Sequence, residues 1–147
     1  MLKVDVKLRG IDEYCNELSK ELKKYKGVRV GYMGNVSYPN GFKVAENALV
    51  QEYGNERIPP RPFMRNAFKK KGDWANLFTQ IWNRGIKKAF LSVGNEIERA
   101  IVKSITSNIP PPNAEATIRR KGSSKTLIDT GTMLNSVQME LLKNDRA

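Results

Sequence analysis

Residues 86–112 read IKKAFLSVGNEIERAIVKSITSNIPPP, and this stretch decides the fold. Apolar residues recur in it every three or four positions, the spacing of one face of an α-helix. The members of this stripe are Ile86, Phe90, Val93, Ile97, Ile101 and Ile105. No helix continues through consecutive prolines, because proline lacks the backbone N–H and clashes with the preceding turn. The stretch therefore predicts the longest helix of the chain, over about residues 86–107.

The segment just before this helix also has a helical pattern. Asp73 precedes it and can accept a hydrogen bond from a free N–H of the first turn, so we expect Asp73 to be the N-cap. Gly85 is expected to separate or bend the two helices. One apolar face, including both tryptophans, is expected in the core; its members are Trp74, Leu77, Phe78, Ile81 and Trp82.

The first third of the chain has the order strand, helix, strand. Polar and apolar residues alternate from Leu2 to Leu8, which predicts a half-buried strand. Helical spacing follows over 11–25, with acidic residues first and basic residues last, as suits a helix dipole. Gly27 is expected to end this helix before a second strand over 28–32. Cys15 is interpreted as a small core or half-buried residue.

The middle of the chain alternates turns with short helices. Asn40-Gly41 indicates a tight turn, so 34–42 is expected to be an exposed loop or short hairpin. Residues 44–53 predict a short helix with Gly54 as its C-terminal cap. Pro62 can open the next helix, which places Phe63 towards the core.

The C-terminal part is short and polar before it becomes apolar again. A turn or two of helix is expected before the loop at Gly122. Asp129 or Thr130 is expected to cap a last short helix. Residues 137–141 alternate, which indicates a final strand or a continuation of that helix, and the strand is favoured. The fold class is therefore α+β. We expect one domain over 1–147: a mixed or antiparallel sheet of about three to four strands packed against the long helix and shorter helices, with mobile loops at 34–42 and 110–126.

The chain carries 26 basic and 15 acidic residues, a net charge of +11. The most one-sided cluster lies between Arg57 and Lys71 and has no acid; its members are Arg57, Arg61, Arg65, Lys69, Lys70 and Lys71. One interpretation is contact with a nucleic-acid phosphate backbone. The other is a solvated face, or a surface that docks onto acidic protein subunits.

The sequence does not favour an enzyme. It has no histidine and one cysteine, which excludes Ser-His and Cys-His dyads, His-containing zinc sites and an internal disulfide. Leu-Ile-Asp-Thr-Gly (127–131) resembles an aspartic protease triad, but such enzymes need two carboxylates that share a proton. Too little chain follows Gly131 to complete that nearly all-β fold. We expect no catalytic residue, no cofactor, no metal and no membrane span.

Five motifs occur in a fixed order along most of the chain. They are ALVQEYG (48–54), RIPPRPFMR (57–65), NIPPPNA (108–114), TIRRKGSSK (117–125) and LIDTGTMLNSV (127–137). Each motif alone is unspecific. As an ordered set over about residues 28–140, they resemble the minor tail components of tailed bacteriophages, the tail-completion or head–tail joining family.

That resemblance implies a non-enzymatic α+β virion protein, assembled in the bacterial cytoplasm, that joins tail to head at the neck. It implies a homo-oligomeric ring, commonly sixfold. The partners it implies are the tail-terminator or tail-tube protein and the head-closure (connector) protein, with DNA passing through the ring. The expected assembly or polyanion contacts are Arg57, Arg61, Phe63, Arg65, Arg119, Arg120 and Lys121. The alternative is a basic, non-specific DNA-binding accessory protein of a mobile element.

Overall fold

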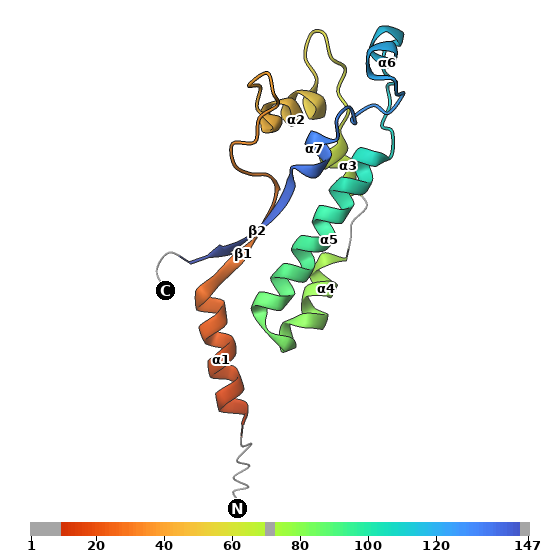
Figure 1. Cartoon of the computed structure of the whole chain (residues 1–147). Helices are drawn as coiled ribbons and strands as arrows, with labels where there is room; N and C mark the ends of the chain where they lie inside the picture. The colour runs from red at the N-terminus through yellow and green to blue at the C-terminus, as the bar shows by residue number, and fades with distance from the viewer. Residues whose placement is uncertain (1–9, 70–72, 145–147) are drawn as a thin grey trace, which may run out of the picture.

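The computed structural model describes residues 10–69 and 73–144, and in it a long helix packs against a small antiparallel sheet (Figure 1). The elements in chain order are α1 (Ile11–Lys24), β1 (Tyr25–Tyr32), α2 (Val44–Tyr53), α3 (Phe63–Lys69), α4 (Trp74–Ile81), η1 (Trp82–Arg84), α5 (Ile86–Thr106), α6 (Glu115–Lys121), α7 (Thr132–Asn135) and β2 (Val137–Lys143). The predicted α+β class is confirmed. The strand expected over 2–8 lies outside the described residues.

Helix α5 lies close against the sheet at Gly94, a buried residue in the middle of the helix. A Cβ atom at this position would lie 2.6 Å from Cγ2 of Val28 on β1 and 2.6 Å from Cγ of Met139 on β2. The absent side chain therefore lets the helix backbone rest on the sheet. On either side of this contact the predicted apolar stripe continues, and its end residues Ile86 and Ile105 are buried.

The sheet pairs β1 with β2, with Val30 opposite Met139 and Tyr32 opposite Val137. The described residues contain these two strands, fewer than the three to four expected. Strand β1 begins directly after Lys24, because Tyr25 is already extended and buried. The expectation that Gly27 ends the preceding helix is therefore wrong; this glycine lies inside the strand, next to a slip in its register.

The core lies where the C-terminal half of α5 meets α2, α3 and α7. Its buried members are Val44, Ala48, Phe63, Ala67, Ile101, Ile105, Ile109, Leu127, Met133 and Val137. Phe63 has no exposed surface, as expected, and its ring packs edge-on against Tyr32. Leu127 and Ile128 of the protease-like string pack into this core.

Two residues expected in the core are exposed. Trp82 is 40% exposed because it lies in the short turn η1 that connects α4 to α5. Cys15 is exposed on α1, which has no buried residue. Trp74 is half-buried and packs edge-on against Phe68.

The turn and cap predictions have mixed outcomes. Asp73 caps α4 by accepting a hydrogen bond from the Asn76 N–H, and Gly54 ends α2 with a φ of 76°. Residues 34–42 contain the expected tight turn, which is closed by a 2.9 Å bond from the Gly41 N–H to the Tyr38 carbonyl.

Of the two residues expected to cap the last helix, Thr130 supplies a side-chain cap, from one position before the N-cap residue. Gly131 occupies the N-cap position of α7, with a φ of 80°, and no side chain caps the helix there. Thr130 lies one residue earlier, and its hydroxyl accepts a 3.3 Å bond from the Thr132 N–H. Asp129 is exposed.

Candidate functional site

Helices α2, α6 and α7 lie towards the same end of the molecule (Figure 1). Together with the proline-containing connections, their residues line a groove of about 820 Å³. Parts of all five sequence motifs line it, although they are separated along the chain. Its walls include apolar side chains, among them Phe42, Pro59 and Met133. Four of the expected contact residues line it: Arg57, Arg61, Arg120 and Lys121.

Arg61 forms the buried wall of this groove, with 5% of its surface exposed. Its guanidinium donates to the backbone carbonyls of Pro111 (Nε, 3.0 Å) and Pro112 (Nη2, 3.3 Å). The amide oxygens of Gln51 and Asn113 each accept a further 3.4 Å bond. Burial lowers the pKa of Arg61 below its ordinary value. A buried cation whose described partners are all neutral leaves a positive potential in the groove.

Side-chain amides fix the two loops that face Arg61. Asn113 donates through Nδ2 to the carbonyl of Lys125 (3.0 Å). Asn108, which has a φ of 56°, accepts a 2.9 Å bond from the Thr126 N–H. These bonds join the connection after α5 to the segment after α6. Helix α6 lies between them, so 110–126 contains the short helix that the sequence predicts.

Three further cations line the groove: Arg57, Arg120 and Lys121. Asp129 is the carboxylate among the lining residues. The Lys121 ammonium donates to the Lys125 carbonyl at 2.7 Å. Its pKa is lowered, mainly by burial; Asp129 opposes that shift, and Arg120 and Arg61 add to it. The groove can therefore accept an anionic group.

The remaining expected contact residues lie elsewhere. Arg119 is on the exposed side of α6, where it pairs with Glu115 at 3.6 Å. Phe63 is buried in the core. Arg65 pairs through Nε with Glu52 at 2.9 Å and also donates to the Glu52 carbonyl. Among the described members of the basic run, the exposed and buried side chains thus do not form one continuous surface; Lys70 and Lys71 lie outside the described residues.

Glu52 is a residue that the sequence did not identify. It is 3% exposed, and its carboxylate accepts bonds from the backbone N–H groups of Met64 (2.8 Å) and Arg65 (3.1 Å) at the start of α3. One signal existed in the sequence: no side chain of Asp, Asn, Ser or Thr immediately precedes Phe63 to cap that helix. A carboxylate eleven residues upstream supplies the cap instead.

Residues 10–69 and 73–144 contain no group of three or more His, Cys, Asp or Glu side chains placed to hold a metal ion. Over the same ranges, no helix combines the length and the apolar character needed to cross a membrane. No model of a known protein family, no curated protein and no solved structure matches this chain.

Proposed function

We propose that this chain is a structural protein of a tailed phage or prophage particle, which completes the tail and joins it to the head at the neck. One observation supports the proposal most. Residues from all five motifs that carry the phage-tail resemblance line the same groove, the one at Arg61. Segments that are far apart in sequence and irregular in structure are held there by bonds to side chains. Such rigid loops suit docking more than they suit a flexible linker.

In this proposal the groove receives an acidic segment of a neck partner. The partner is the tail-terminator or tail-tube protein, or the head-closure protein. Arg57 and Arg120 on the groove supply charge. The apolar side chains Phe42 and Pro59 supply contact area. A groove of this kind fits a polypeptide better than a DNA duplex, because a duplex presents its phosphates on a convex surface. The protein is placed in the virion after assembly in the bacterial cytoplasm.

The proposal is tested in the phage or prophage that encodes the chain. Arg57→Glu combined with Arg120→Glu changes exposed groove residues and should leave the fold intact by circular dichroism. We expect heads and tails to accumulate separately in electron micrographs of lysates. Arg119→Glu is the matched control, since it reverses a charge on the outer side of the same helix and should allow joining.

Normal virions from the double variant, or from a gene deletion, would contradict the proposal. The DNA-binding alternative is tested separately, by titrating the purified chain with duplex DNA. Tight binding that weakens steeply with salt would favour that alternative. Arg61 and Arg65 are unsuitable for either test, because their guanidiniums hold the fold together.

A further inference from the structure

Asp129 is a carboxylate in an otherwise basic groove, and nothing in the proposed function uses it. Among the described residues that line the groove at Arg61, it is the one acidic side chain, beside four cations. Asp129 is exposed, and it does not cap the helix that follows it. A carboxylate in this position changes which ligands the groove can accept, because it repels other anions and attracts donors.

The backbone around Asp129 is held in place on both sides. Leu127 is 7% exposed and Ile128 packs against the core, so the residues before Asp129 are anchored. After it, the Thr130 hydroxyl lies 2.7 Å from the Thr132 hydroxyl and accepts a bond from the Thr132 N–H. The carboxylate therefore projects from a fixed backbone.

The cations beside Asp129 bond to neutral groups instead of to its carboxylate. The Lys121 ammonium donates to the Lys125 carbonyl at 2.7 Å, and the Arg61 guanidinium donates to the Pro111 carbonyl at 3.0 Å. Within the described part of the chain, Asp129 forms no ion pair, and its carboxylate accepts no hydrogen bond. The negative charge of the groove is therefore not cancelled by direct contact with a cation.

The charge of Asp129 reaches other groups that line the groove. Burial is the main cause of the raised pKa of Tyr38; a hydrogen bond from Asn47 opposes that rise, and Asp129 adds to it. Burial lowers the pKa of Lys121, and Asp129 opposes that decrease. A ligand that enters the groove between these side chains therefore also comes within range of the carboxylate.

This arrangement distinguishes a polypeptide from a nucleic-acid strand. Arg57 and Arg120 are exposed, and neither forms an ion pair with a described residue, so each can bind an acidic side chain. A polypeptide can at the same time place a backbone N–H or a basic side chain against Asp129. A nucleic-acid strand carries a negative charge at every phosphate, so one of its phosphates would lie near the carboxylate.

We propose that Asp129 is a specificity-determining residue of the groove, whose charge repels nucleic-acid strands from the site that receives an acidic polypeptide. Specific sites commonly combine attraction of the right partner with repulsion of the wrong one. Repulsion is useful here, because a net charge of +11 attracts any polyanion, including the DNA that passes the neck in the proposed setting. The inference rests on the proposed function for the identity of the polypeptide.

The test measures how tightly the purified chain binds a short, fluorescein-labelled oligothymidylate, a strand thin enough to enter a basic groove. Binding is followed by fluorescence anisotropy in about 0.1 M salt, where charges more than about 10 Å apart are largely screened. Asp129→Asn removes the charge and keeps the shape of the side chain. Glu115→Gln is the matched control, because it changes the net charge by the same amount on the outer side of α6. Circular dichroism checks folding, and Asp129→Ser replaces Asp129→Asn if that variant loses its helical spectrum.

We expect Asp129→Asn to bind the strand about fivefold more tightly than the wild type, because one repulsive charge is removed from a partly solvated groove. Glu115→Gln should gain no more than about twofold, because its charge lies outside the groove and is screened. In a chain that also carries Arg57→Ala and Arg120→Ala, the Asp129→Asn change should bring no gain. Without those two cations the groove no longer attracts the strand.

Four results would overturn the inference. The first is equal binding by the wild type and Asp129→Asn, including no measurable binding by either. The second is an equal gain from Glu115→Gln, which would mean that net charge alone matters. The third is an undiminished gain without Arg57 and Arg120, which would place the strand outside the groove. The fourth is unfolding of both Asp129 variants, since Asp129 would then support the fold.

These measurements use the purified chain alone, so they can fail separately from the proposed function. Normal virions from the Arg57→Glu, Arg120→Glu variant would contradict the neck role and leave the oligothymidylate result unchanged. Equal binding by the wild type and Asp129→Asn would remove the role of Asp129 and leave the neck role intact.

Discussion

The Arg61 groove and helix α1 differ in what fixes them. Around Arg61 the backbone is irregular, yet the guanidinium and two asparagine side chains bind carbonyl and N–H groups of distant segments. Helix α1 has regular periodicity and well-placed charges, yet two hydrogen bonds link it to the α5 end of its own chain. Regular secondary structure therefore does not show how firmly a segment is held in the fold. The tertiary contacts of the segment determine this.

The largest effect is expected from Arg61→Ala. This substitution leaves the carbonyls of Pro111 and Pro112 without their donor and opens a cavity in the groove wall. Hydrogen bonds made by a charged group contribute about 1.5–3 kcal/mol, so we expect a loss of about 3 kcal/mol in the free energy of unfolding. Urea denaturation followed by circular dichroism measures it.

The matched control is Arg57→Ala, in the same groove but exposed, which should change stability by less than about 0.5 kcal/mol. Equal effects of the two substitutions would mean that Arg61 does not hold the loops. The loss of stability caused by Arg61→Lys should lie between those caused by Arg57→Ala and Arg61→Ala. Lysine keeps the positive charge, but its ammonium cannot reproduce the planar set of donors of a guanidinium.

The contrast between the two regions also shows what the sequence could predict. Helix α5, helix α2 and strand β2 were expected from periodicity, since one buried face imposes that pattern. Arg61 could not be distinguished from Arg57 in the run of basic residues. Its burial depends on carbonyls about fifty residues away, which come close only in the folded chain. The same reason explains why Glu52 was missed, and why Trp82 and Cys15 were wrongly expected in the core.

A second substitution tests the contact that lies between the two regions. In Gly94→Ala, the new methyl would lie 2.6 Å from Val28 and from Met139, so the helix and sheet must separate. We expect a loss of about 2 kcal/mol, in the range for overpacked cores. Adding Val28→Ala should recover part of it, since that change removes one clash. If the two effects simply add, the residues do not touch.

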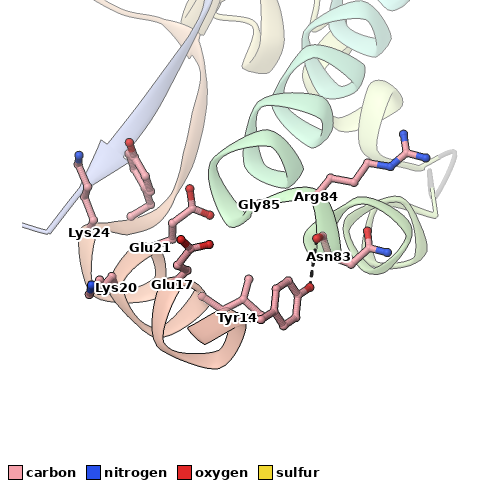
Figure 2. A pocket seen from close by; sticks show the side chains of 10 residues that line it. Tyr14, Glu17, Lys20, Glu21, Lys24, Asn83, Arg84 and Gly85 are labelled. Atoms are coloured by element: carbon pink, nitrogen blue, oxygen red, sulfur yellow. Dashed lines mark hydrogen bonds between the residues drawn. The ribbon is translucent and has the colours of Figure 1, made fainter. Parts of the chain in front are cut away.

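A third substitution loosens α1 from the rest of the chain. Glu21→Ala removes the carboxylate that caps α5, and the Ile86 N–H loses its 2.6 Å bond. Loss of an N-cap costs about 1 kcal/mol, and we expect that decrease in urea denaturation. Glu17→Ala is the control, because Glu17 lies one turn before Glu21 on α1 and, like Glu21, lines the pocket between α1 and the start of α5 (Figure 2). A larger effect from Glu17 than from Glu21 would refute the cap.

The smallest effect is expected from Leu22→Ala on α1, measured at a protein concentration low enough for the monomer to predominate. Leu22 is 55% exposed, so truncating it removes little buried surface, and alanine favours the helix at least as well. The free energy of unfolding should change by less than about 0.5 kcal/mol. A loss above about 1.5 kcal/mol under these conditions would mean that Leu22 packs against its own chain, which would remove the contrast with Arg61.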